Sequence, residues 1–343
     1  MIGRVFIIGS ASRIGLPGGW SIERAVHDVV EDALQSAEII SRDAIDAVVT
    51  VGSDIIDGSM IATRSGIAGS YGRELITVPS SGGHAFGAAV ALIESGSAQT
   101  VLLAGWGEGT KFGAFDGRVI QADPFWARPV GADALALGAL QAQRLQTGGR
   151  LSIIDAKNYA DAMGSRARGP NGAPLASTAH WLMPNWVDGA AAIVLSASAR
   201  GREAIVVRDF GSSFRPYCPE PEDFDPAQWV VSALGHMRDP SALVGLSLAA
   251  IEASAPTAFC EALALEALLP QTGWDVLDAR VNSSGGGAVT HFGPATALRQ
   301  LSFAAEAIRG PRSGDVAGAA VLDLAGPIGQ ATTVILLESG SAA

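Results

Sequence analysis

The sequence predicts an α/β protein built from two copies of one strand–turn–helix unit. Short apolar runs rich in β-branched residues alternate with longer segments of helical periodicity, a pattern typical of buried sheets covered by helices. The hexapeptide VPSSGG at 78–83 recurs as VNSSGG at 281–286. Each copy is followed by a helical segment and then by a strand that ends in Ala-Gly, VLLAG at 101–105 and VLDLAG at 321–326. This repeat in the same context indicates an internal duplication.

The strands are predicted from short apolar runs that are bounded by turn residues. They are 4–9, 47–51, 76–78, 100–104, 191–196, 204–209, 257–260, 279–281, 319–324 and 332–338. The clearest helix follows Ser21, a good N-cap residue, and its apolar side chains recur at helical spacing from Ile22 to Leu34. A second helix is predicted over 241–253.

The stretch ITVPSSGGHAFGAAVALIESG at 76–96 predicts a strand that turns sharply into a helix. Serine and glycine at 80–83 mark the turn, and Gly96 stands where a helix would be capped. Such elbows often hold a nucleophile, because a helix N-terminus stabilises a developing anion. Here the turn offers a proline and two serines, so the elbow has no evident nucleophile.

Composition excludes several classes of function. The chain has 343 residues, of which 48% are hydrophobic and 17% charged, and its net charge of −11 comes with no clustered stripe of Lys and Arg. We therefore expect no nucleic-acid partner. Cys218 and Cys260 are too few for a disulfide framework or a four-thiolate zinc site, and we expect no metal. With no signal peptide and no apolar run of membrane length, we expect a cytoplasmic protein.

Four motifs, in the same order, resemble the thiolase superfamily, and most closely its sterol-carrier-type members. DAKNYADAMGSRARGPNGAP at 155–174 is similar to the lysine-asparagine helix and loop of that family. WVDGAAAIVLSASAR at 186–200 resembles the Asp-Gly-Ala-Ala-Ala strand that ends its first half. AFCEALALEAL at 258–268 looks like its Asn-Glu-Ala-Phe-Ala motif. VNSSGGGAVTHFGPATA at 281–297 looks like the stretch that leads into its Gly-His-Pro motif.

The resemblance covers nearly the whole chain and implies a five-layer αβαβα fold made of two duplicated halves. The N-terminal half would comprise 1–104 and 187–200, and the C-terminal half 201–343. Residues 105–186 have no counterpart in the second half and would form an inserted loop domain over the site. A homodimer and coenzyme A thioester substrates, with no other cofactor, are also implied. Some relatives work with an OB-fold protein that carries a zinc ribbon.

The departures from the family concern its nucleophile. In active members a cysteine at the elbow takes the acyl group and a histidine activates it. Counting back from Ser81, that cysteine falls on Pro79, which has no nucleophilic atom. The family's late second cysteine is missing too, because no cysteine follows Cys260. Covalent acyl transfer by the usual route is therefore not expected.

Two residues are the catalytic candidates. His291 stands at the position of the Gly-His-Pro histidine, and it is either a base or oxyanion donor facing a thioester, or a loop histidine with a structural hydrogen bond. Cys260 stands where the family has Asn or His, at a predicted strand end facing the pocket. It is either a small buried hydrophobe or a thiol that works near His291. We expect Pro79 to face the same cavity as both.

Four further residues are candidates for substrate binding. Ser80 is either an N-cap or a direct contact. His84 is either a neutral imidazole near the substrate at a helix N-terminus or a residue with a surface or core role. Gly286 and Gly329 belong to glycine-rich turns that would shape the pocket of the thioester.

Three functions remain open from the sequence, and so does whether the chain is an enzyme. The first is a thiolase-like protein that binds coenzyme A thioesters and cleaves carbon–carbon bonds without an acyl-cysteine, as in a retro-aldol reaction. The second is a non-catalytic subunit that pairs with an active thiolase homologue or with an OB-fold protein. The third is an acetyl-CoA acyltransferase that uses Ser80 or another displaced nucleophile.

Overall fold

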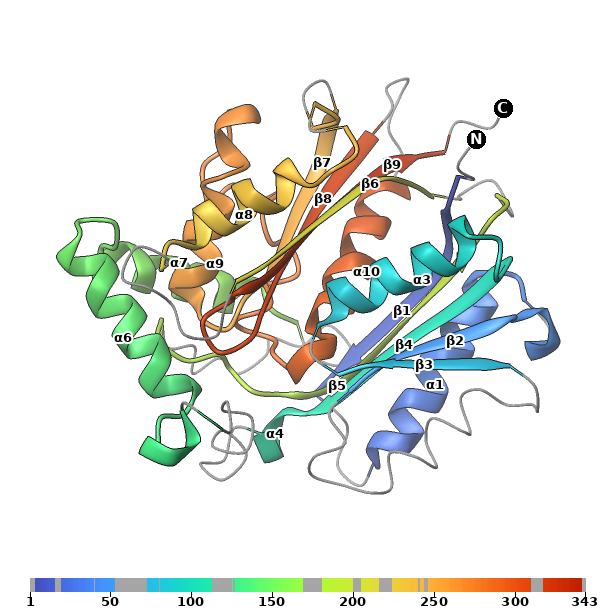
Figure 1. Ribbon diagram of the computed structural model, residues 1–343, viewed down its shortest axis with the longest axis horizontal. Coiled ribbons are helices and arrows are strands. Elements are labelled where there is room, and N and C mark those ends of the chain that lie inside the picture. Colours follow the sequence, from blue (N-terminus) through green and yellow to red (C-terminus); the bar gives the residue numbers. More distant parts are fainter. Residues whose placement is uncertain are drawn as a thin grey trace.

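The computed structural model describes residues 4–15, 20–39, 41–52, 73–79, 81–112, 125, 127–168, 181–199, 205–215, 224–239, 241–243, 246–309 and 317–340. Its strands are β1 (Phe6–Ile14), β2 (Ala47–Val51), β3 (Glu74–Val78), β4 (Thr100–Glu108), β5 (Asp188–Ser196), β6 (Ile205–Phe214), β7 (Ser247–Ser254), β8 (Ala317–Ala325) and β9 (Ala331–Ser339). Its α-helices are α1 (Ile22–Ser36), α3 (Gly82–Glu94), α4 (Gly109–Phe112), α6 (Ala134–Thr147), α7 (Ile153–Arg166), α8 (Pro226–Gly235), α9 (Ala258–Leu265) and α10 (Thr296–Arg309). Figure 1 shows their arrangement.

Within the described residues, the nine strands form one sheet whose second part repeats the strand order of the first in mirror image. The order is β3-β2-β4-β5-β1-β6-β9-β8-β7. In the first part β2 and β4 are parallel and β4 and β5 antiparallel, and in the second part β7 and β8 are parallel and β8 and β9 antiparallel. A short antiparallel pairing of β1 with β6, at Phe6 and Ile7, joins the two parts. This mirrored order is the one that a duplicated α/β unit predicts.

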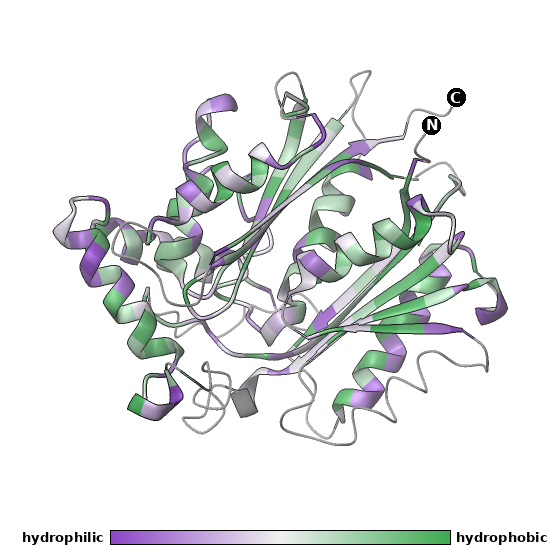
Figure 2. Ribbon diagram, in the orientation of Figure 1, coloured by the Kyte–Doolittle hydropathy of each residue, from purple (hydrophilic) through white to green (hydrophobic). Residues whose placement is uncertain are grey.

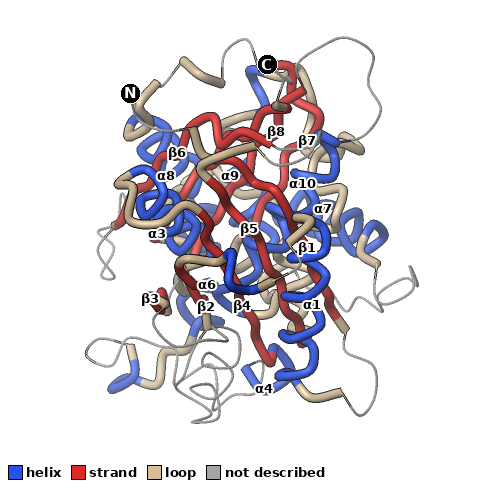
Figure 3. Tube along the Cα trace, turned by 90° about the vertical axis from the view of Figure 1, so that its right-hand side faces the viewer, coloured by secondary structure: helices blue, strands red, loops and turns tan. Residues whose placement is uncertain are grey.

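Three hydrophobic cores define five layers. In the middle core, α3 and α10 pack between the facing sides of the two sheet parts, for example against Val49 of β2 and Ile335 of β9 (Figure 1). The outer side of the first part packs on α1, which Figure 3 shows along β1 and β5. The outer side of the second part packs on α8 and α9. Most strands of both parts are buried on both faces, and they are correspondingly rich in hydrophobic residues (Figure 2).

Small residues let the middle helices approach the sheet closely. A Cβ added to Gly83 would lie 1.8 Å from Oγ1 of Thr333 on β9, and one added to Gly87 would lie 2.6 Å from the ring of Phe210 on β6. A Cβ on Gly82 would lie 3.1 Å from that of Ala297, so α3 and α10 also meet directly. The two middle helices therefore contact each other directly.

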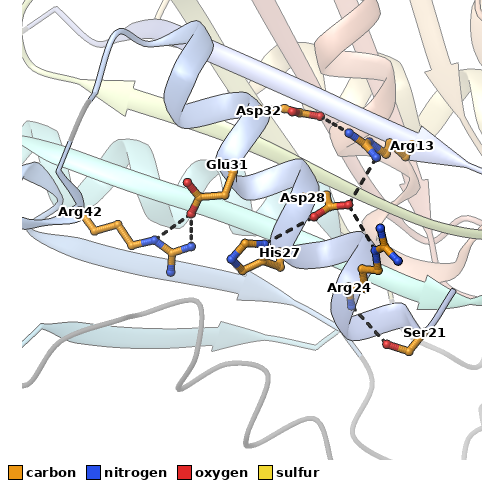
Figure 4. A network of polar contacts seen from close by, with 8 residues as sticks. All are labelled: Arg13, Ser21, Arg24, His27, Asp28, Glu31, Asp32 and Arg42. Carbon is orange, nitrogen blue, oxygen red and sulfur yellow. Dashed lines mark hydrogen bonds and ion pairs between the residues drawn. The ribbon is translucent and has the colours of Figure 1, made fainter.

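The outward face of α1 is a polar surface (Figure 4). Arg13 of β1 donates to Asp32 at 2.6 Å and lies 3.6 Å from Asp28, while Arg42 pairs with Glu31. Exposed pairs of this kind contribute little to stability, about 0–1 kcal/mol each. They make the solvent-facing side of α1 polar, whereas the side that faces the sheet is apolar.

Helices α6 and α7 of the predicted insertion lie at one end of the molecule beside α9 (Figure 1). Tyr159 and Met163 of α7 belong to the same core as Phe259 of α9. The connection starts later than residue 105, because β4 continues to Glu108 opposite Asp188 of β5.

Three predicted elements are wrong. The predicted strand at 257–260 is the start of α9, where Thr257 is the N-cap and its side chain accepts from the backbone N–H of Cys260. The predicted helix at 241–253 contains most of β7 instead. An alanine-rich strand that is buried on both faces has no alternation of polar residues, so its pattern resembles a helix. The predicted strand at 279–281 is reduced to one parallel bridge between Val281 and Ile251 of β7.

The sequence repeat keeps its place in the fold only as far as the turn. Val78 ends β3 beside β2, and Val281 lies beside β7 in the corresponding edge position. After the first copy, α3 begins at Gly82. After the second copy, a longer loop that carries His291 comes before α10 begins at Thr296.

The contact of Gly83 with Thr333 predicts a large effect of one added methyl group. Gly83→Ala should lower the free energy of unfolding by about 1–3 kcal/mol, because its Cβ would overlap a β-branched side chain on a central strand. Gly235→Ala, in the last turn of α8 with no atom within 4 Å, is the control and should be neutral or stabilising. Urea unfolding of both variants measures the difference. Equal stabilities would contradict the packing of α3 against β9.

Candidate functional site

The elbow between β3 and α3 is present as predicted. Pro79 is exposed directly after β3, and Ser81 is the N-cap of α3, with its hydroxyl accepting from the backbone N–H of His84 at 3.1 Å. Gly96 has a positive φ of 76° just after the helix, as a C-terminal glycine does. Ser80 lies outside the described residues. The elbow therefore carries Pro79 at the position where the resemblance places the family's cysteine.

A buried carboxyl group from the other half of the chain holds this elbow. Oδ2 of Asp323, on β8, accepts from the hydroxyl of Ser81 at 2.7 Å and from the backbone N–H of Gly83 at 2.8 Å. Burial raises the pKa of Asp323 to about 6, against the effect of these two hydrogen bonds. Asp323 is not among the candidates predicted from the sequence, although an aspartate within the apolar run VLDLAG was a usable signal.

His291 lies on a loop that pairs with a second loop. Its backbone N–H donates to the carbonyl of Asn185 at 3.1 Å, and its carbonyl accepts from Val187 at 2.8 Å. The imidazole is half-buried, contacts the ring of Trp186 edge-on at 4.5 Å between centroids, and has Nδ1 3.5 Å from Oγ1 of Thr296. Burial lowers the pKa of His291 to about 4, so the ring is neutral at pH 7.

The elbow and the His291 loop are in contact. A Cβ added to Gly82 would lie 3.1 Å from the carbonyl oxygen of Pro294, in the turn between His291 and α10. Since Gly82 begins α3 and Thr296 begins α10, the two segments meet at the N-termini of the middle helices. The structure thus brings together two of the three segments that the sequence predicted to converge.

Buried polar side chains anchor the segment that precedes His291. Arg299 of α10 donates to Oγ1 of Thr290 at 3.0 Å and to the carbonyl of Ser284 at 3.1 Å. Burial lowers its pKa to about 10, so it stays a cation at pH 7. Glu252 of β7 accepts at 2.6 Å from the hydroxyls of Ser283 and Ser284. These contacts fix the segment that leads into His291.

Gly286 is part of a second buried cluster. Its φ is 75°, and an added Cβ would lie 2.2 Å from Oε1 of Glu261. This carboxyl group accepts from Tyr159 at 2.7 Å and from Asn282 at 2.8 Å, and burial raises its pKa to about 8. Gly286 therefore shapes the loop around Glu261, which is a packing role.

Cys260 lies in a different place from the one predicted. It is in the first turn of α9 and fully buried, with Sγ 3.6 Å from the carbonyl oxygen of Ile328, which also accepts from Gln141 of α6. Burial raises its pKa well above the usual range. Gly329, with a φ of 87°, lies against this sulfur, and its added Cβ would be 3.2 Å away. Cys260 and Gly329 thus pack together under the β8–β9 turn, on the core side.

His84, in the first turn of α3, is the second histidine of the elbow region. It is half-buried, its ring centroid lies 6.4 Å from that of Phe214, and burial lowers its pKa. Both histidines near the elbow are therefore neutral at pH 7. Within the described ranges, His, Cys, Asp and Glu side chains nowhere gather in a group of three that could bind a metal.

The fold matches solved thiolase-superfamily structures over nearly the whole chain, at low sequence identity. The Ltp2-ChsH2(DUF35) aldolase aligns with a TM-score of 0.73 and 16% identity, over 98% of each chain. Human mitochondrial 3-ketoacyl-CoA thiolase in complex with CoA aligns with a TM-score of 0.69 and 16% identity, over 99% of each chain. A monomeric SCP2-thiolase-like protein type 1 from Mycobacterium smegmatis aligns with a TM-score of 0.67 and 17% identity, over 98% of this chain and 78% of that one.

No family model matches the chain, and no curated protein matches its sequence. The structural likeness shows a thiolase fold, as the resemblance implied. In the described part of the chain no helix is both long and apolar enough to cross a membrane.

The burial of Cys260 predicts an unreactive thiol. In a Cys218→Ser background, a disulfide reagent such as DTNB should label Cys260 at least about 100-fold more slowly in the folded protein than in guanidinium chloride, because both access and ionisation are suppressed. Cys260→Ala should keep the fold and lose about 1–3 kcal/mol of stability. Fast labelling of the folded protein would contradict the core position.

The lowered pKa of His291 predicts a loss of stability in acid. Between pH 6.5 and about 4 the unfolded chain binds a proton at this residue and the folded chain does not, so stability falls as the pH falls. His291→Gln should remove up to ~3 kcal/mol of that loss, and it should leave stability at pH 8 nearly unchanged. Chemical unfolding at several pH values tests this, and parallel pH curves for the two proteins would refute it.

Proposed function

We propose that this chain binds coenzyme A thioesters and cleaves a carbon–carbon bond in them by a retro-aldol route, without an acyl-enzyme. The observation that supports it is the pairing of an intact elbow that carries Pro79 with a neutral His291 on the adjoining loop. The resemblance places the acyl-accepting cysteine at Pro79. A retro-aldol cleavage requires a base and an oxyanion donor, and it needs no nucleophile.

The proposed reaction uses the two histidines in different roles. The base takes the proton of a β-hydroxyl, the Cα–Cβ bond breaks, an aldehyde or ketone leaves, and the electron pair becomes a thioester enolate that is then protonated at Cα. An imidazole with a pKa of about 4 is a poor base but can donate an N–H, so we assign His291 to the thioester oxygen. His84, whose pKa is also lowered by burial, is the candidate base.

Neither Cys260 nor Ser81 takes part in this proposal. Cys260 is assigned to the core, and the hydroxyl of Ser81 is buried and donates to Asp323. An acetyl-CoA acyltransferase would therefore depend on Ser80 or another displaced nucleophile. Acetyl transfer from acetoacetyl-CoA to coenzyme A is the assay for that alternative.

A second candidate function is a thiolase-like subunit of a heteromeric enzyme. The observation that favours it is the structural match to an aldolase whose name carries a second component, ChsH2(DUF35). The partner would be an OB-fold protein with a zinc ribbon or an active thiolase homologue. Co-purification from the native host tests this function, and turnover by the chain alone would exclude a purely non-catalytic role.

A homodimer is also part of the proposal. β3 is the last strand in the sheet order, and Leu75 on it is 40% exposed. An edge strand with exposed apolar residues can pair with the same strand of a second copy. Light scattering of the purified protein gives the mass that decides between monomer and dimer.

The proposed chemistry predicts release of a carbonyl product from β-hydroxyacyl-CoA substrates. Mass spectrometry of a panel with different β-substituents should detect a shortened acyl-CoA together with an aldehyde or ketone. His291→Ala should lower kcat about 10²–10³-fold, and His84→Ala about 10²–10⁴-fold.

His27→Ala is the matched control for these variants. This histidine lies on the exposed side of α1 beside Asp28 (Figure 4), and its removal should leave the rate unchanged. A panel that stays intact with the wild-type protein, or equal rates for all three histidine variants, would refute the proposed reaction.

A further inference from the structure

The first turn of α3 is already bound to an acidic group of the same chain. Oδ2 of Asp323 accepts from both the Ser81 hydroxyl and the Gly83 backbone N–H, and Ser81 Oγ in turn accepts from the His84 backbone N–H. Two of the free N–H groups at this helix N-terminus therefore have internal acceptors. We call Asp323, Ser81 and Gly83 the elbow clamp.

The elbow clamp is closed on its sheet side by Thr333. This residue is paired with Asp323 across β8 and β9, and its side chain fills the space where Gly83 would carry a Cβ. All three side chains of this contact, Asp323, Ser81 and Thr333, are buried. A charge interaction in such a dry site is screened far less than one at the surface.

The charge of Asp323 changes what the elbow can do. A helix N-terminus carries the equivalent of about half a positive charge and normally favours an anion beside it. With a carboxylate already at that place, a second negative charge at the elbow meets repulsion instead of attraction. The same charge would raise the pKa of any thiol at position 79.

We propose that Asp323 is a positioning residue that occupies the anion-stabilising end of α3, so that negative charge developing on a thioester is stabilised by the His291 loop and not by the elbow. The role of Asp323 in the reaction rests on the proposed function, whereas its electrostatic effect on the elbow does not. Pro79 then only shapes the elbow, while the neutral imidazole of His291 donates the hydrogen bond to the thioester oxygen. The two segments are in contact where Gly82 meets Pro294.

A thiol introduced by Pro79→Cys in a Cys218→Ser background reports the electrostatic potential at the elbow directly. Its pKa is obtained from the rate of alkylation by iodoacetamide as a function of pH, with the protein that lacks Pro79→Cys as the blank for Cys260. Adding Asp323→Asn should lower this pKa by about half a pH unit or more, because the helix N-terminus then acts on the thiolate unopposed.

Asp209→Asn is the matched control. Asp209 is also buried and accepts backbone N–H groups, from Asp239 at 2.9 Å and from Phe210 at 2.7 Å, but it lies on β6 away from the first turn of α3. It should leave the pKa of the introduced thiol unchanged. Asp323→Ser, which keeps an acceptor for the Gly83 N–H without a charge, should act like Asp323→Asn and guards against misfolding of one variant.

The outcomes separate this inference from the proposed function. An unchanged thiol pKa in both folded Asp323 variants, with thermal melting as the check on folding, would overturn the electrostatic role. A lowered thiol pKa in a protein that cleaves no thioester would keep the elbow clamp and refute the proposed reaction. In an active protein, Asp323→Asn should lower kcat about 10-fold or more with little change in KM. The N-terminus of α3 would then compete with His291 for the negative charge that develops on the thioester.

Discussion

The close packing of α3 against α10 in the middle layer is the constraint on which the rest of the structure depends. Both sheet parts bury their inner faces on these two helices, so neither part has a complete core without them. The N-terminus of α3 lies so close to its neighbours that Gly82 contacts Ala297 of α10 and Gly83 contacts Thr333 of β9. Because α3 begins at the elbow and α10 begins just after His291, the same packing fixes the two segments of the candidate site relative to each other.

Most of the fold could be predicted from the sequence, because its signals are local. The turn at the elbow, the N-cap Ser21 of α1 and the apolar runs of β2 and β8 each carry their own pattern. β7 could not be separated from a helix, since its alanine-rich run is buried on both faces. The start of α9 was missed because Ala258 and Phe259 continue an apolar run, and only the N-cap Thr257 marks the boundary.

The site was predicted in part, and the missing part consists of long-range contacts. The elbow and His291 were found because each belongs to a motif. Asp323 was not, since its partner Ser81 is 242 residues away and nothing local in β8 indicates that pairing. Arg299 likewise acts through Thr290 on the far side of a loop. Cys260 was misplaced because the motif was aligned with a strand end, whereas its backbone is helical and turns the thiol into the core.

The chain has a thiolase fold whose elbow carries Pro79 beside a loop with the neutral His291. We propose that this site binds a coenzyme A ester. Isothermal titration calorimetry with a β-hydroxyacyl-CoA tests that claim most directly, because it measures binding and does not depend on turnover. The account predicts saturable binding with one site per chain that free coenzyme A weakens by competition. Absence of binding at millimolar ligand to the folded protein would contradict it.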